Sequence, residues 1–242
     1  MEFTQLRERI QRITNQARRW LDVNDCVLCQ SSVESGHWLR LLCETCYGDL
    51  DILPLGQDLL FDHPKWTAGL LASNCDGMVV IGKYDWPLSR LIQGLKYHKH
   101  LYQAELLGQL LAAQLDANTW PGIDAICPLP LHPSRQRARG YNQSQLLSRV
   151  IAKALGIKMC HGLIRVKPTA SQATLNRRER QGNVKQAFDF VDDYLHRVRG
   201  KTILLVDDVI TTGATVDQAS LALKHAGAAA VYVAAAAIQP YG

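Results

Sequence analysis

The sequence predicts an α/β protein in which a parallel β-sheet is covered by helices and preceded by a small cysteine-rich unit. From residue 77 onward, short apolar segments typical of buried strands alternate with segments that have the periodicity of helices. Such alternation favours a parallel sheet with helices on both faces. Ahead of it lie four cysteines in two closely spaced pairs. The 242 residues allow one large domain or two modest ones, and a hydrophobic content of 47% suffices for a substantial core.

The first 23 residues are predicted to contain an amphipathic helix. Apolar residues recur there at steps of three and four, the spacing of one helix face, which we expect to pack on the cysteine unit or the next domain. The segment lacks the apolar core of a signal peptide, and no apolar stretch of the chain reaches the ~20 residues of a membrane helix. We therefore expect a cytoplasmic protein without membrane insertion. The apolar positions are Phe3, Leu6, Ile10, Ile13, Ala17 and Leu21.

Residues 24–50 are predicted to form a zinc-binding module. The spacing is Cys26-x2-Cys29-x13-Cys43-x2-Cys46, and each pair can chelate an ion from one tight turn. Four thiolates fill a tetrahedral shell, so the zinc would be structural. Two disulfides are the alternative, which a reducing cytoplasm disfavours, while a redox centre would need only one pair. His37 lies between the pairs as an alternative ligand.

The remaining chain is divided into a linker at 51–76 and a domain at 77–242. Predicted strands cover residues 77–84, 123–130, 161–166, 187–191, 202–208 and 229–238. Predicted helices cover residues 87–97, 101–115, 142–156 and 215–227, and a polar loop spans 167–186. Three further cysteines have no partner pattern and are expected to be buried thiols. They are Cys75, Cys127 and Cys160.

The basic charge is concentrated in two segments. Residues 132–149 carry a net charge of +4 and residues 165–185 carry +5, while the whole chain carries +5. The rest of the chain is therefore acidic. Such concentration indicates a multiply charged anion or a phosphate backbone as a ligand, with solvated loops as the alternative.

The stretch "ILLVDDVITTGAT" at residues 203–215 predicts a ribose 5-phosphate site. Asp207 and Asp208 end a buried strand, on the side of a parallel sheet where ligands bind. Adjacent carboxylates can accept hydrogen bonds from two vicinal ribose hydroxyls. The loop that follows leads into a helix N-terminus, where free backbone N–H groups bind phosphate, and Gly213 permits close backbone approach. Hydroxyl donors in this loop are Thr211, Thr212 and Thr215.

Three other interpretations of this stretch are less consistent with the sequence. A Walker loop would need a lysine after the second glycine, and none is present. A response-regulator receiver also ends a strand in paired acids, but only 34 residues follow Asp208, too few for the rest of that domain. A purely structural turn would leave two carboxylates at a buried strand without a partner, which is costly.

All thirteen positions of this stretch resemble the phosphoribosyl diphosphate (PRPP) binding signature of type I phosphoribosyltransferases. Together with the four cysteines, "YDWPLSRLIQGLKY", "CPLPLHPSRQRARGYNQ" and "QATLNRRERQGNVKQAF" resemble the ComF family. That family is associated with natural competence and includes proteins described as gluconate-utilisation factors. The resemblance covers about residues 24–242 and implies a type I phosphoribosyltransferase fold for residues 77–242.

The resemblance also implies a role for particular residues. Asp207 and Asp208 match the ribose-binding acids, and Lys96 matches a recurrent lysine in the helix after the first strand. The 5-phosphate loop comprises Thr211, Thr212, Gly213, Ala214 and Thr215. Candidate diphosphate contacts are Arg135, Arg137, Arg139 and Gly140. Arg177, Arg178 and Arg180 fall in the mobile catalytic loop, in which Gln186 replaces a frequent glycine.

Two functions remain open on these grounds. The first is a Mg²⁺-dependent phosphoribosyltransferase of unknown acceptor, in which arginines and Mg²⁺ stabilise the departing diphosphate and the acids stabilise the ribose. The second is a non-enzymatic module that senses PRPP or a nucleotide, or that holds single-stranded DNA beside a DNA-translocating helicase. Few aromatics accompany the basic segments, Tyr141 being the clearest, which weakens a base-stacking surface. No extra subdomain for a nucleobase is apparent.

Overall fold

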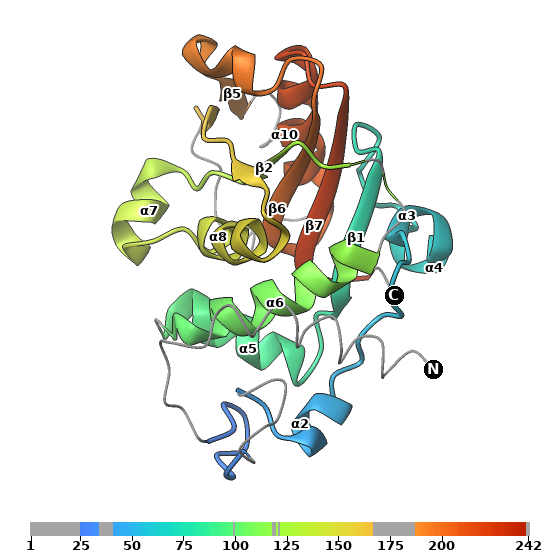
Figure 1. Ribbon diagram of the computed structural model, residues 1–242, viewed down its shortest axis with the longest axis vertical. Coiled ribbons are helices and arrows are strands. Elements are labelled where there is room, and N and C mark those ends of the chain that lie inside the picture. The colour runs from blue at the N-terminus through green and yellow to red at the C-terminus, as the bar shows by residue number, and fades with distance from the viewer. Residues whose placement is uncertain are drawn as a thin grey trace.

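A five-stranded parallel sheet forms the centre of the computed structural model (Figure 1), which describes residues 25–33, 41–98, 100–117, 120, 122–166 and 187–240. Its strand order is β1-β7-β6-β2-β3, with every neighbouring pair parallel. The predicted α/β fold with a parallel sheet is thereby confirmed. The strands are β1 (Gly77–Lys83), β2 (Ala125–Pro128), β3 (Lys158–Met159), β6 (Thr202–Ile210) and β7 (Ala230–Ile238).

Helices cover both faces of this sheet, because side chains along each strand alternate between two apolar clusters. Val79 of β1 belongs to the cluster that holds Leu91 and Leu107, whereas Val80 belongs to the cluster that holds Leu223. Among the described helices of ten or more residues, three therefore lie on the first cluster and one lies on the second. These are α5 (Leu88–Tyr97), α6 (Tyr102–Ala117) and α8 (Gln143–Leu155) on the first face, and α10 (Ala214–His225) on the second.

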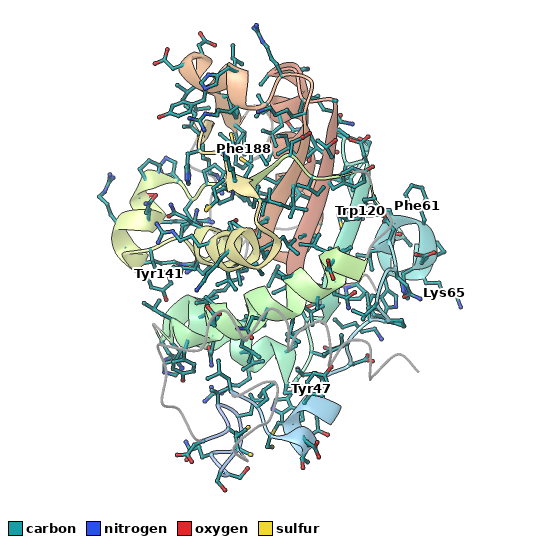
Figure 2. The ribbon with its side chains drawn as sticks, in the orientation of Figure 1. Tyr47, Phe61, Lys65, Trp120, Tyr141 and Phe188 are labelled. Atoms are coloured by element: carbon teal, nitrogen blue, oxygen red, sulfur yellow. The ribbon has the colours of Figure 1, made fainter. Side chains whose placement is uncertain are left out.

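Two of the predicted strands lie outside the parallel sheet. β4 (Leu163–Arg165) and β5 (Phe188–Phe190) pair antiparallel in a sheet of their own, followed by a 3-10 helix, η1 (Asp192–Arg197). Each strand has three residues and buries only alternate side chains, the pattern of a half-exposed antiparallel pair. Phe188, labelled in Figure 2, and Phe190 pack into the cluster on the α10 face.

Residues 51–76 were expected to be a linker, but the structure shows them packed against β1. The segment contains α3 (Leu59–Asp62) and α4 (Pro64–Thr67), and Leu59 is fully buried. Leu53 N donates to Ile81 O at 2.8 Å, and Asp58 Oδ1 accepts from Met78 N at 3.1 Å. The cause is the place of β1 at the sheet edge, where unpaired backbone groups need partners.

The end of this segment is attached to α10. Asp217 Oδ1 accepts from Asn74 N at 2.9 Å and from Asn74 Nδ2 at 3.0 Å. Leu71 N donates to Thr212 O at 2.9 Å. Residues 70–74 therefore support the loop between β6 and α10.

The cysteine-rich unit packs against the same core as α5 and α6. It contains α2 (Glu44–Gly48), and its buried residues Leu42, Cys46 and Tyr47 belong to the apolar cluster under these helices (Figure 2). The helix predicted within residues 1–23 lies outside the described residues. Within the part of the chain that the structure describes, no helix has the length and apolarity needed to span a membrane.

Candidate ribose-phosphate site and cysteine cluster

Asp207 and Asp208 lie near the carboxyl end of β6, which continues two residues beyond the predicted end at 208. Asp207 Oδ1 accepts from Ser144 Oγ at 3.1 Å and from the backbone N of Asp208 at 2.8 Å. Ser144 is held by Asn142, which caps α8 by accepting from Ser144 N at 3.0 Å and donates to Leu129 O at 2.9 Å. The cap thus sets the position of the serine beside the acid.

Lys96 reaches the acidic pair from α5. Its Nζ lies 2.8 Å from Asp208 Oδ1, and the two side chains are only 16% and 14% exposed. Burial acts to lower the pKa of Lys96, but the charge and hydrogen bond of Asp208 and the charge of Asp207 outweigh it, so the pKa is raised. The structure therefore brings together three of the predicted residues, from α5 and β6.

Burial raises the pKa of Asp207 to about 7, and the neighbouring charge of Asp208 acts in the same direction. The backbone N–H of Asp208, the charge of Lys96 and the Ser144 hydroxyl oppose this rise. A carboxyl with such a pKa lacks enough compensation for its negative charge. A ligand that brings hydroxyl donors or a cation to this carboxyl would provide it.

This pKa predicts a pH dependence of the unliganded protein. Because the folded pKa lies above the ordinary value of 3.8, the folded state retains a proton that the unfolded state releases. The contribution of Asp207 to stability is fully present below pH ~4 and is lost as pH rises through ~7. Asp207→Asn should flatten the decline of melting temperature between pH 5 and 8, measured by thermal denaturation. A variant with the same decline as the native chain would contradict the assignment.

Residues 211–213 join β6 to α10, with Gly213 as the N-cap of the helix, and Ala214 and Thr215 of the predicted loop are the first two residues of the helix. Gly213 has no side chain to accept from the first-turn amides, and helix starts of this kind bind anions. Thr212 and Ala214 are buried, at 3% and 4% exposure. Thr212 therefore lies inside the loop and helps to hold it.

Gly213 was expected to allow a phosphate to approach the backbone. In the structure the atoms that lie closest to it belong to Leu70 and Leu71 of the same chain. The φ of Gly213 is +76°, and a Cβ built there would overlap the carbonyl oxygen of Leu71 and lie 2.9 Å from Leu70 Cγ. Both the left-handed backbone and this close approach require glycine. The loop is thus packed on residues 70–71, which the sequence did not indicate.

Gly213→Ala should lower the free energy of unfolding more than Gly200→Ala. Both glycines have a positive φ, which costs a substituted residue about 1–2 kcal/mol, but a Cβ on Gly200 (φ +68°) would have no atom within 4 Å. Only the first substitution adds a steric overlap. Urea denaturation of the two variants measures the difference, and equal losses would show that Leu71 moves away freely.

The predicted diphosphate segment is a short helix, α7 (Pro133–Arg139), capped by His132 and ended by Gly140 with φ +82°. Arg139 Nη1 donates to Gln143 Oε1 at 3.1 Å, and its guanidinium lies 5.6 Å from the ring centre of Tyr97. Arg139 is thus attached to α8 and faces the end of α5. Arg137 lies on the same helix, and its neighbour Arg135 interacts electrostatically with Arg139.

Ser144 and Arg165 are site residues that the sequence patterns did not indicate. Arg165 on β4 is 8% exposed, with its guanidinium 5.3 Å from the ring centre of Phe188. Burial and the charge of Arg135 lower its pKa, while the charge of Asp207 acts to raise it. In the sequence Arg165 belongs only to a basic segment, because its electrostatic interaction with Asp207 arises from the tertiary fold. The predicted Arg177, Arg178 and Arg180, and Gln186 with them, lie outside the described residues.

The four cysteines of the N-terminal unit form one cluster. The sulfur atoms of Cys26, Cys29, Cys43 and Cys46 all lie within 4.8 Å of one another, and all four are free thiols rather than disulfides. The Sγ atoms of Cys29 and Cys43 are 3.7 Å apart. A tetrahedral site with Zn–S bonds of about 2.3 Å requires sulfur separations of roughly 3.8 Å. The donor set and its geometry therefore fit a zinc module.

Residues 147–240 match the protein family that is described as "Phosphoribosyl transferase domain". The chain is 33% identical over 217 residues to Competence protein F of Haemophilus influenzae, covering 86% of this chain and 87% of that protein. It is 32% identical over 227 residues to DNA utilization protein YhgH of Escherichia coli K12, covering 86% and 94%. Among solved structures, a Bacillus subtilis glutamine PRPP amidotransferase complexed with ADP and GMP aligns at 24% identity and a TM-score of 0.37, over 55% of this chain and 25% of that one.

The two curated relatives match over most of both chains at more than 30% identity. These matches extend beyond the phosphoribosyl transferase domain, which covers only residues 147–240. The chain therefore belongs to the ComF family within the phosphoribosyltransferase superfamily.

Proposed function

We propose that the protein binds PRPP, or a closely related ribose 5-phosphate ligand, at the acidic pair and transfers its phosphoribosyl group. The supporting observation is that Lys96 pairs with Asp208 and Ser144 donates to Asp207. Both acids precede the N-terminus of α10 in the chain by a few residues. The acids accept from the ribose hydroxyls. The loop at 211–215 binds the 5-phosphate with its backbone amides.

The departing diphosphate is assigned to the arginines. Cleavage of the bond at C1 of the ribose places negative charge on the diphosphate and positive charge on the ring. Arg135, Arg137 and Arg139 on α7 supply three cations, and Arg165, which interacts electrostatically with Arg135 and Asp207, adds a fourth. In this proposal Arg177, Arg178 and Arg180 complete the charge around the diphosphate, with Arg178 and Arg180 acting in catalysis.

Mg²⁺ is proposed to bind together with PRPP. At this site, the described carboxylates are those of Asp207 and Asp208, and both already have protein partners in Ser144 and Lys96. Two carboxylates with partners do not form a complete oxygen cage, so the ion would be held mainly by phosphate oxygens and water. When bound, it neutralises charge on the diphosphate.

The structural role of zinc and the cellular context are also proposals. A closed shell of four thiolates serves stability rather than catalysis. The relatives bear the names Competence protein F and DNA utilization protein. We therefore assign the protein to DNA uptake and use in the cytoplasm, in cooperation with a DNA-translocating helicase.

The proposal is tested by calorimetry with PRPP, with and without Mg²⁺, followed by assays of diphosphate release with a panel of nitrogenous acceptors. Mg²⁺-dependent PRPP binding together with acceptor-dependent diphosphate release is the expected result. Binding without release for any acceptor would favour a PRPP sensor. No binding of PRPP or ribose 5-phosphate would overturn the assignment of the site.

A second candidate function, binding of single-stranded DNA, is favoured by an exposed aromatic beside the arginines of α7. Tyr97 is 66% exposed and lies under Arg139. Tyr141, the clearest aromatic beside the basic segments in the sequence, is partly buried and donates its hydroxyl to Leu95 O (Figure 2). In this second proposal Tyr97 is the residue on which a base stacks.

If α7 contacts the phosphates, affinity for single strands should fall with salt, with a slope of roughly −0.7 per phosphate contacted. Arg137→Ala should reduce this slope by about one contact. Arg199→Ala is the matched control, because Arg199 is exposed and lies before β6, at the opposite end of the sheet. Fluorescence anisotropy in a salt series measures both. Equal slopes for the two variants would exclude α7 as the contact.

A further inference from the structure

A cavity of about 300 Å³ lies between the end of β2, α7 and β4. Its wall includes Cys127 and Cys160, together with His161 and Arg165. His161 and Ile164 on this wall are exposed, so the cavity reaches the surface. The proposed ribose-phosphate site leaves both cysteines unused.

The two thiols lie side by side on neighbouring parallel strands. Ile126 of β2 pairs with Met159 of β3, and Cys160 N donates to Ile126 O at 2.8 Å. Cys127 follows Ile126 in β2, Cys160 directly follows the end of β3, and both belong to the apolar cluster on the α10 side. Adjacent strands lie about 4.8 Å apart, within the Cα separation of about 4.4–6.8 Å that a disulfide spans.

The surroundings make the two thiols chemically unequal. The hydrogen bond from Cys127 lowers the pKa of Cys160 to about 6, with further help from the Gly162 N–H and the charges of Arg197 and Lys201. The bond to Cys160 and burial raise the pKa of Cys127 well above its ordinary value. One thiol is thus prepared to attack as a thiolate, while the other keeps its proton, as in dithiol sites that react with oxidants.

We propose that Cys160 and Cys127 form a reversible dithiol modification site that reacts with small peroxides entering through this cavity. The Cys160 thiolate attacks a peroxide oxygen, the O–O bond breaks, and a sulfenic acid and water are formed. The sulfur of Cys127 then attacks the sulfenic sulfur and displaces a second water. In total, two thiols lose two protons and two electrons, and hydrogen peroxide is reduced to two waters.

The site can be tested on the full-length, zinc-loaded protein. Trypsin releases Cys127 in the peptide 100–135 and Cys160 in the peptide 159–165, and neither peptide contains another cysteine. After exposure to a small excess of hydrogen peroxide and alkylation of the remaining thiols, mass spectrometry should find these two peptides linked. Dithiothreitol should separate them. Cys75→Ser should form the same link, because Cys75 lies against Ser220 and outside the cavity.

A second measurement does not depend on disulfide formation. The rate of Cys160 alkylation by iodoacetamide should reach half its maximum near pH 6. Cys127→Ala should slow it at pH 6.5 by at least about threefold, which is the fall in thiolate fraction caused by a rise of one pKa unit from about 6. Zinc content and melting temperature show whether the variant is folded. Both cysteines recovered as free thiols after peroxide, or a link from either one to a zinc-module cysteine, would overturn the proposal, as would unchanged alkylation in Cys127→Ala.

Discussion

Replacing both Asp207 and Asp208 by asparagine is expected to weaken PRPP binding by at least tenfold while leaving the protein folded. Asparagine keeps the size and much of the hydrogen-bonding capacity of aspartate but removes the charge. Each lost charge-assisted hydrogen bond costs about 1–3 kcal/mol of binding free energy. The fold should survive, because the pair lies near the end of β6. Burial of the Asp207 charge is unfavourable, and the partners of this carboxylate offset that cost only in part. Calorimetry measures the affinity, and thermal denaturation measures the fold.

Asp76→Asn is the matched control for this experiment. Asp76 also pairs with a lysine, with Asp76 Oδ1 lying 3.0 Å from Lys224 Nζ, but it precedes β1 and lies at the opposite end of the sheet. Its loss should leave PRPP affinity unchanged. If the double asparagine variant binds PRPP as tightly as this control, the resemblance of the loop marks ancestry, and the site does not hold the sugar.

Replacing Cys43 by serine is expected to release zinc. The loss should destabilise the cysteine module and also the part of the core that packs against it. Structural zinc contributes apparent binding free energies of about 10–16 kcal/mol in small zinc domains, and this energy supports folding. Cys26 and Cys46 belong to the apolar cluster that also contains Leu91 and Leu107 of α5 and α6. Loss of the metal should therefore expose part of this core, lower the melting temperature and reduce solubility.

The zinc prediction is checked by elemental analysis of protein purified without chelator. The native chain should contain about one equivalent of zinc, and Cys43→Ser well under half. Cys75→Ser is the control, because that thiol lies beside Ser220, and all four cluster cysteines remain in the variant. Less than half an equivalent in the native protein would refute the zinc assignment.

The sequence predicted much of the fold because its patterns are local. Apolar runs and helical periodicity placed β1, β6, β7, α5, α8 and α10 within a few residues of their observed bounds. The clustering of the four cysteines could be predicted from their spacing along the chain alone. The packing of residues 51–76 against β1 and α10 could not be predicted from the sequence, because the apolar residues of this segment follow no period.

By itself, the sequence indicated the cysteine cluster and the candidate ribose-phosphate site of this protein. The cysteine pairs and the loop at 203–215 each lie within a short stretch, so residue type and spacing are enough to recognise them. Only the tertiary structure decided which distant side chains surround them. Lys96 and Ser144 reach the acidic pair from different helices, and Gly213 is required by Leu71, more than a hundred residues away. The dithiol pair arises from the register of β2 and β3. The physical reason is that the packing of the whole chain sets such contacts, and no local pattern encodes the distance between residues far apart in sequence.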